Sequence, residues 1–224
     1  MTLRPLFLLL AVISFAFSSL GVALRPHTEE KRDDNFPARV PYVFPAPGTD
    51  PIADAIRARR ANGTLLALDG VLLNAPLVAS TWNSLFGVIR NNTTLPGNMR
   101  ELIILRIAAL NEASYEWLQH EPVGRSEGLT TAQLRVVRLT PAFNEGAGVT
   151  NTLGASLAAM MTFTDWSTKT AKVPDRVFAN LQKVLNNQQL VEAAATVGGY
   201  NFVSRFLLAL DVDGKNNAPV PIPN

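Results

Sequence analysis

The chain has 224 residues, 47% of them hydrophobic, which is enough for one compact core or for two small domains. Its formal charge of +2 resides in the first 32 residues, which carry four basic and two acidic side chains. The remaining residues are balanced in charge, so nothing indicates a nucleic-acid-binding patch. The absence of cysteine excludes disulfides, thiolate catalysis, Cys-ligated zinc and dithiol redox chemistry.

Residues 1–23 have the pattern of a secretory signal peptide. Arg4 precedes an apolar run from Leu6 to Phe17, and the small residues Gly21 and Ala23 predict cleavage after Ala23. The alternative is an uncleaved membrane anchor over residues 6–24, which the serines within it disfavour. We therefore expect a secreted protein, or one in the lumen of the secretory pathway, with no membrane contact after cleavage.

Two further features of the sequence agree with export. Lys31-Arg32 is a dibasic pair typical of a processing site, and sequons predict glycosylation at Asn62, Asn91 and Asn92. We expect residues 24–49 to form a pro-segment and a proline-rich arm, because proline lacks an amide donor and favours extended backbone. Residues 213–224 are also rich in proline and are expected to form a flexible tail.

Residues 50–212 are predicted to form one helical domain. Caps, prolines and apolar periodicity indicate helices at about 51–61, 65–73, 76–90, 98–110, 114–125, 131–139, 150–170, 175–185 and 188–210. The helix at 98–110 has almost no polar face and should be central. Without strand-like alternation anywhere, the sequence predicts an all-α bundle.

The run Tyr115-Glu116-Trp117-Leu118-Gln119-His120 is the most chemically suggestive part of the chain. Glu116 and His120 are four residues apart, so a helix places them on one face. His27 lies in the segment expected to be removed, which leaves His120 as the one histidine of the folded domain. It is therefore the one side chain there whose ordinary pKa is near neutral.

A sharp turn at Asn111 would pair the helices 98–110 and 114–125 as an antiparallel hairpin. Glu101 then lies level with His120 or Glu121, and Arg106 lies level with Glu116. Carboxylates and an imidazole in an apolar site can have their pKa values pushed apart, so that one group becomes an acid and another a base. The alternative is a solvated Glu–His pair beside a structural ion pair. Iron or manganese would need a second histidine, so no metal is expected.

The run Arg100-Glu101-Leu102-Ile103-Ile104-Leu105-Arg106-Ile107-Ala108-Ala109-Leu110, followed by Tyr115-Glu116-Trp117 and His120, resembles the carboxymuconolactone decarboxylase family. That family includes the alkyl hydroperoxidase D (AhpD)-like proteins, and the likeness extends over residues 50–212. It implies an orthogonal or antiparallel helical bundle that assembles into homo-trimers or homo-hexamers. The redox branch carries a glutamate, two cysteines and a histidine where this chain has Glu101, Ala113, Glu116 and His120. The thiols are absent, which excludes the thiol peroxidase and disulfide reductase reactions.

The decarboxylase-type branch implies a lyase or isomerase that needs no cofactor and uses acid–base chemistry on a small carboxylated or lactone substrate, with export suggesting secondary metabolism. The resemblance and the hairpin together assign catalysis to His120, Glu116 and Glu101, and substrate binding to Arg106, Tyr115, Trp117 and Arg205. The alternative is a non-catalytic exported helical binding protein that retains the fold. A closed cavity of a few hundred Å³ reaching His120 would favour the enzyme. A solvent-filled surface groove, or a His120 buried against apolar neighbours, would favour the binding protein.

Overall fold

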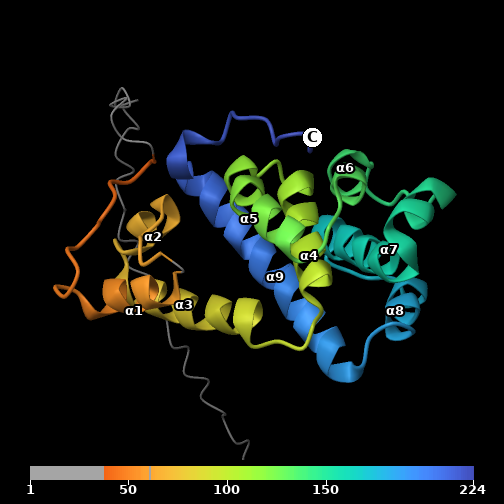
Figure 1. Ribbon diagram of the computed structural model, residues 1–224, viewed down its shortest axis with the longest axis horizontal. Helices are drawn as coiled ribbons and strands as arrows, with labels where there is room; N and C mark the ends of the chain where they lie inside the picture. The colour runs from red at the N-terminus through yellow and green to blue at the C-terminus, as the bar shows by residue number, and fades with distance from the viewer. Residues whose placement is uncertain (1–37, 61) are drawn as a thin grey trace, which may run out of the picture. The chain divides into compact units, whose positions relative to one another are not determined.

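The computed structural model describes residues 38–60 and 62–224. Over these residues the chain forms nine α-helices and a final 3-10 turn, without any strand (Figure 1). The elements are α1 (Pro51–Arg59), α2 (Ala67–Leu72), α3 (Pro76–Asn91), α4 (Gly97–Leu110), α5 (Ser114–Ser126), α6 (Thr131–Leu139), α7 (Ala147–Thr170), α8 (Asp175–Gln182), α9 (Asn187–Leu210) and η1 (Val212–Gly214). The predicted all-α class is confirmed. The predicted signal peptide, the Lys31-Arg32 pair and the start of the proline-rich arm lie outside the described residues.

Several helices begin where the sequence predicts because a polar side chain caps their first free amides. The Asp50 carboxylate accepts hydrogen bonds from the amides of Ile52 and Ala53 at the start of α1, and Pro51 occupies the first helical position. Thr130 forms a reciprocal capping box with Gln133 at the start of α6. These local bonds fix the ends of the elements independently of how the helices pack.

α7 differs most from its prediction. It begins at Ala147, three residues before the expected start at Thr150, and it is interrupted at Gly154, whose φ of 76° and ψ of 163° are not helical. Glycine tolerates this positive φ because it has no Cβ. α7 is therefore two helices joined at Gly154, a break that the apolar periodicity of the sequence does not reveal.

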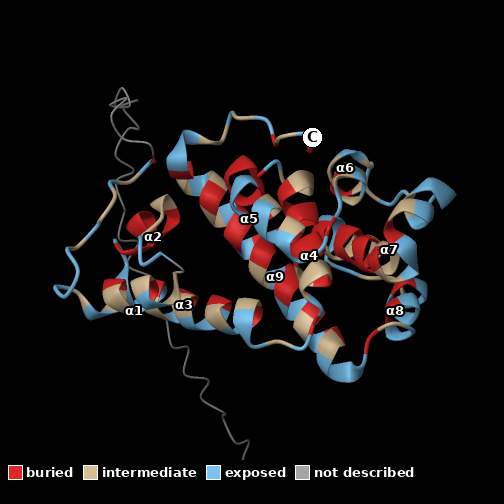
Figure 2. Ribbon diagram, viewed as in Figure 1, coloured by how far each residue is buried: buried red, intermediate tan, exposed pale blue. Residues whose placement is uncertain are grey.

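α4 is the central helix of the bundle, as its apolar sequence predicts. It packs against α5, α6, α7 and α9, and Figure 2 shows its residues buried on nearly every side. Leu102–Leu105, Ile107 and Ala108 have no exposed surface. Because the surroundings of α4 are apolar, its two charged residues Glu101 and Arg106 require partners within the protein.

The predicted α4–α5 hairpin is present. The turn passes through Glu112 in the left-handed region (φ 59°), and the Asn111 side chain donates to Asn201 Oδ1 and Ser204 Oγ of α9 at 3.1 and 2.8 Å. Gly124 lets the two helices approach closely, since a Cβ at this position would lie 2.9 Å from Leu105 Cδ1. The hairpin thus brings the inner face of α5 against the first half of α4.

The C-terminal residues, which the sequence predicts to be flexible, lie against α5 and α6. Ser114 Oγ donates to the carbonyl of Pro219, Arg138 donates to that of Val220, and Arg135 donates to that of Pro223. Val220 is 4% exposed and belongs to the core. These bonds replace the regular secondary structure that the three prolines of the tail prevent. Among residues 38–60 and 62–224, no helix is both long and apolar enough to span a membrane.

Candidate active site

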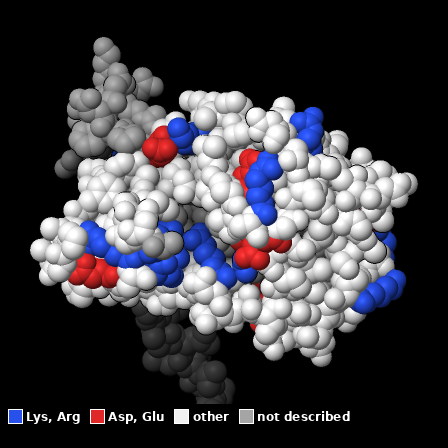
Figure 3. Space-filling view, viewed as in Figure 1, with Lys and Arg blue, Asp and Glu red and all other residues white. Residues whose placement is uncertain are grey.

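A cavity of about 300 Å³ opens beside the α4–α5 hairpin. Its polar lining comes from α3, α4 and α5, from the residue after α5 and from the segment before α2. It comprises Arg60, Arg90, Asn91, Arg100, Glu101, Tyr115, Glu116, Gln119, His120 and Glu127. Leu66, Leu68, Val123, Val203 and Leu207 supply apolar wall. Figure 3 shows basic side chains in a row beside a hollow in this face, with acidic side chains next to it. The volume suits a small molecule.

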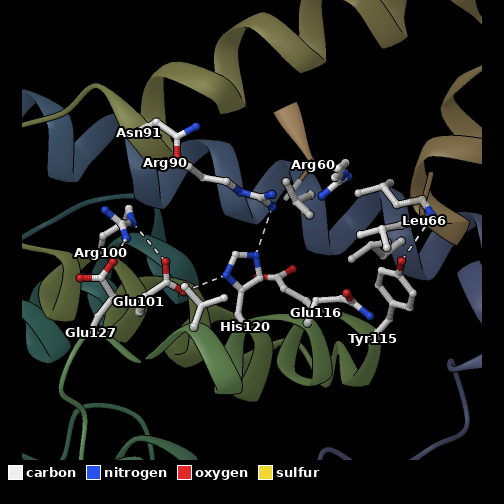
Figure 4. Close-up of a pocket in the computed structure, with 15 residues that line it drawn as sticks. Arg60, Leu66, Arg90, Asn91, Arg100, Glu101, Tyr115, Glu116, His120 and Glu127 are labelled. Carbon is white, nitrogen blue, oxygen red and sulfur yellow. Dashed lines mark hydrogen bonds and ion pairs between the residues drawn. The ribbon is translucent and has the colours of Figure 1, made fainter. Parts of the chain in front are cut away.

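Glu101 and His120 meet across the hairpin, as predicted. Glu101 Oε2 lies 2.8 Å from His120 Nδ1, and the two side chains are 1% and 7% exposed (Figure 4). The other oxygen of Glu101 accepts a hydrogen bond from Arg100 Nε at 3.1 Å. The carboxylate therefore fixes the orientation of the imidazole ring, and Arg100 fixes the carboxylate.

Arg90 approaches the opposite side of the same imidazole. Its Nη2 lies 3.2 Å from His120 Nε2. A guanidinium has only donors, so Nε2 must accept and carries no proton. The ring proton then resides on Nδ1 and is donated to Glu101 Oε2. The hydrogen-bond network thus assigns His120 as a neutral imidazole with its lone pair on Nε2.

Burial is the main cause of the ionisation state of His120. It lowers the pKa of His120, and although Glu101 acts to raise this pKa, the net shift is downward. Burial acts in the opposite direction on Glu101, but the interactions with His120 and Arg100 outweigh it, and the pKa of Glu101 is lowered. The site therefore holds an ionised Glu101 beside a neutral His120 at neutral pH, in agreement with the hydrogen-bond assignment.

Glu116 lies one helical turn before His120 on the same face of α5 and also lines the cavity. It is 1% exposed, and neither of its carboxyl oxygens has a hydrogen-bond partner among the described residues. Burial raises the pKa of Glu116 well above its ordinary value, and the charge of Arg90 opposes this only in part. Burial without a hydrogen-bond partner therefore favours the protonated, neutral form of Glu116.

Two aromatic hydroxyl groups complete the polar environment. Tyr115 OH lines the cavity and accepts a hydrogen bond from the Leu68 amide at 3.3 Å, and burial raises the pKa of Tyr115 to about 12. Tyr200 OH accepts from Arg90 Nε at 2.7 Å, and its ring packs edge-on against His120 with centroids 5.2 Å apart. Tyr200 thus holds both Arg90 and His120 in place.

The predicted position of Arg106 opposite Glu116 is wrong. Arg106 binds Asp165 of α7 through Nε–Oδ1 and Nη2–Oδ2 contacts of 2.6 and 3.0 Å, and its Nη1 donates to the carbonyls of Val137 and Thr140. Each of these partners lies in the core, and Arg106 does not line the cavity. Arg106 was singled out because it is a charged residue in an apolar helix. Asp165 fits the same description, and the two residues pair with each other.

Trp117 and Arg205 are also not brought to the cavity. Trp117 follows Glu116 by one residue, which turns its side chain into the core, where it is fully buried and its Nε1 donates to Glu121 Oε2 at 2.7 Å. Arg205 is exposed and donates to Asn201 Oδ1 at 2.9 Å. Of the predicted site residues, the structure gathers Glu101, Tyr115, Glu116 and His120 around one cavity.

Three residues of the site were missed by sequence reasoning. Arg90 and Tyr200 lie on α3 and α9, and only the packing of these helices brings them to His120. Arg100 precedes Glu101 directly, and its adjacency to a buried carboxylate was an available signal. The predicted glycosylation sites Asn62, Asn91 and Asn92 are all exposed, and Asn91 borders the cavity. Within the described part of the chain, no three metal-ligating side chains gather at one point.

Comparison with known proteins supports the predicted family. Residues 76–158, which span α3 to the first half of α7, match the model of the carboxymuconolactone decarboxylase family. This segment contains Arg90, Glu101, Glu116 and His120. No curated protein is similar enough to the chain to count as a relative.

Three solved structures share the fold. A protein of unknown function from Agrobacterium tumefaciens, associated with the antioxidant defence protein AhpD, is 19% identical over 62% of this chain and 91% of its own, with a TM-score of 0.52. An AhpD core, a peroxidase-related protein from Ralstonia eutropha JMP134, is 18% identical over 78% and 90%, with a TM-score of 0.54. A variant of the debrominase Bmp8 in complex with 2,3,4-tribromopyrrole is 16% identical over 76% and 88%, with a TM-score of 0.60. The predicted AhpD-like bundle is confirmed.

Proposed function

We propose that the protein is a cofactor-independent lyase or isomerase that moves protons on a small carboxylated or lactone substrate. One observation carries the proposal: a neutral imidazole, His120, and a neutral carboxylic acid, Glu116, face the same cavity from successive turns of α5. A base and an acid that coexist at neutral pH are what general acid–base catalysis requires. The family match and a related fold that holds a small ring compound also support it.

In this proposal His120 is the base. Its Nε2 lone pair lies on the side of the ring away from Glu101, so a proton taken up by Nε2 produces an imidazolium that the Glu101 carboxylate stabilises at 2.8 Å. Glu101 acts through His120 by fixing the ring and its tautomer. Arg100 in turn holds the carboxylate of Glu101 in place.

Glu116 is the corresponding acid. In an isomerisation, His120 removes a proton from carbon next to a carbonyl, the electron pair moves into the carbonyl system, and Glu116 delivers its proton to another carbon. In a decarboxylation, the bond to the carboxylate breaks, CO2 leaves, and the resulting enolate takes the proton of Glu116 at carbon. Both reactions balance without a redox partner, and the Arg90 guanidinium is available to stabilise the enolate.

The alternative is a non-catalytic binding protein. The cavity reaches His120, as an enzyme requires, but it is partly open at the surface, so the case for the enzyme rests on the ionisable groups that line it. We further propose that the chain is exported, glycosylated and homo-oligomeric, and the exposure of all three sequon asparagines supports the glycosylation. Mass analysis of the secreted chain, before and after glycan removal, tests this: a chain that begins at Leu24 and carries glycan is expected, and retention inside the cell would contradict it.

The proposed chemistry is tested by hydrogen–deuterium exchange at carbon. Small carboxylated lactones and β-keto acids are incubated in D2O with the wild type, His120→Gln or Glu116→Gln, and deuterium incorporation and CO2 release are followed by mass spectrometry. Loss of either proton-transfer group is expected to slow exchange or turnover by about 10²–10⁴-fold. Leu118→Ala, at an exposed position of the same helix, is the matched control. Equal rates in wild type and His120→Gln would remove His120 from the mechanism.

A further inference from the structure

Arg90 is partly buried, and no carboxylate is in direct contact with its guanidinium. Its contacts are Tyr200 OH and His120 Nε2, both uncharged acceptors, and it forms no ion pair with any carboxylate among residues 38–60 and 62–224. The Glu101 carboxylate lies on the other side of the imidazole, bonded to Nδ1. Moving a guanidinium out of water without a direct counter-charge is costly, so this arrangement suits a site that an anion completes.

The other two arginines of the cavity show the contrast. Arg60 binds Asp69 through two contacts of 3.1 and 2.6 Å. Arg100 binds Glu101 and Glu127 at 3.1 and 2.9 Å. Both guanidinium charges are therefore neutralised by the protein itself. Arg90 is the cavity cation that remains for an anionic ligand, and its Nη1 makes no hydrogen bond to any described residue.

The position of Arg90 also blocks the base. Its Nη2 donates to the Nε2 lone pair of His120, which is the atom that must accept a proton from a substrate. As long as this hydrogen bond persists, the imidazole is held neutral but unreactive. A substrate that only filled the cavity would leave the bond in place. A substrate that offered Arg90 an anionic oxygen would compete with Nε2, because an anion adds a Coulomb attraction to the guanidinium that a neutral nitrogen cannot provide.

We propose that Arg90 is an anion-operated cap on His120: an anionic ligand in the cavity draws the guanidinium away from Nε2 and frees the imidazole to accept a proton. The inference rests on the proposed function of His120 and extends it. It restricts the ligands to small anions with a carboxylate or enolate oxygen for Arg90. The unpartnered carboxyl of Glu116, buried in the same wall, adds a requirement for a second oxygen that accepts its proton.

The cap is tested without turnover, by ¹⁵N NMR of His120 in the full chain. The chain contains two histidines, so His27→Ala leaves His120 as the one labelled ring. Benzoate or acetate is added at constant ionic strength, and benzamide serves as an uncharged match for benzoate. We expect both anions to shift the Nε2 resonance saturably and to raise the pKa of His120 by about one unit, a tenfold change in proton affinity. Benzamide should do neither.

Variants identify the residue that responds. In Arg90→Met the imidazole has no cap, so the ring should already have the higher pKa and the anions should have no further effect. Arg176→Met, which removes an exposed arginine paired with Glu145, should respond like wild type. The proposal is overturned by an anion response that persists in Arg90→Met, by an equal response to benzamide, or by the absence of a saturable response to either anion.

These outcomes are separate from those that test catalysis. If His120 responds to anions but no deuterium exchange occurs at carbon, the protein binds anions through Arg90 without catalysis. That result would keep the cap and overturn the proposed function. Deuterium exchange that depends on His120, together with no anion response, would keep the proposed function and overturn the cap.

Discussion

Two arginines reach into the interior, the buried Arg106 and the partly buried Arg90, and they differ in whether the protein supplies a counter-charge. The Arg106 guanidinium, between α4 and α7, donates hydrogen bonds to both carboxylate oxygens of Asp165 and to the carbonyls of Val137 and Thr140. Arg90, between α3 and α5, contacts only uncharged acceptors and lies beside Glu116, whose carboxyl has no partner among the described residues. The protein supplies every partner of Arg106. It supplies neither an anion in contact with Arg90 nor a hydrogen-bond acceptor for Glu116.

This difference separates structural from functional charge more reliably than burial does. Both arginines, and both Glu116 and Asp165, are polar groups in largely apolar surroundings. A polar group whose partners all come from the protein stabilises one packing arrangement. A polar group left incomplete imposes a free-energy cost, which is understandable when a ligand supplies the missing partner.

The largest effect is expected from breaking the satisfied site. Arg106→Met leaves the Asp165 carboxylate buried without its partner, and it should lower the free energy of unfolding by about 3–5 kcal/mol. Arg90→Met removes a guanidinium that has no ion pair but loses its hydrogen bonds to Tyr200 and His120, so it should lower the free energy of unfolding by only about 1–2 kcal/mol. Urea denaturation of the two variants measures the difference. Equal losses in both would contradict the distinction.

A smaller effect is expected from separating the helices that build the cavity. In Gly124→Ala the new methyl group would lie 2.9 Å from Leu105 Cδ1, whereas in Gly198→Ala it would meet nothing within 4 Å. Both changes gain helix propensity, so the comparison isolates the cost of overpacking. We expect Gly124→Ala to be less stable than Gly198→Ala by about 1–3 kcal/mol in thermal unfolding. A similar stability of the two variants would show that a methyl group fits between α4 and α5 without overpacking.

The smallest effect is a pH-dependent gain in stability from Glu116→Gln. Because the pKa of Glu116 is raised on folding, the native state retains this proton above the unfolded pKa of 4.5, and wild-type stability falls as pH rises from there toward the folded pKa. Glu116→Gln removes that cost, so its advantage over wild type should be absent near pH 4 and should grow as the pH rises to 8. A constant difference across this range, measured by denaturation at each pH, would contradict the raised pKa.

Most of the fold follows from local sequence, and about half of the site does. Caps and prolines such as Asp50, Pro51 and Thr130 fix helix starts, and the apolar sequence of α4 determines its central place. The Glu101–His120 contact was predictable because the two residues lie at nearly equal distances from the turn at Asn111.

The remaining contacts depend on packing between elements that are distant in sequence. Arg106 meets Asp165 at a separation of 59 residues, and Arg90 meets Tyr200 at a separation of 110. No periodicity within one helix encodes such a pair. The non-helical Gly154 in α7 was missed for a related reason, since glycine occurs both inside helices and at breaks.

In the proposed site, α5 presents a neutral carboxylic acid beside a neutral imidazole. The ionisation of the Glu116 carboxyl decides whether this is so. The protein is labelled with ¹³C at the glutamate carboxyl groups, and the Glu116 resonance is identified by its absence from Glu116→Gln. We expect this carboxyl to be still protonated at pH 7 and to titrate well above 4.5, while the exposed glutamates titrate near their ordinary value. A Glu116 resonance that titrates together with the exposed glutamates would contradict the claim.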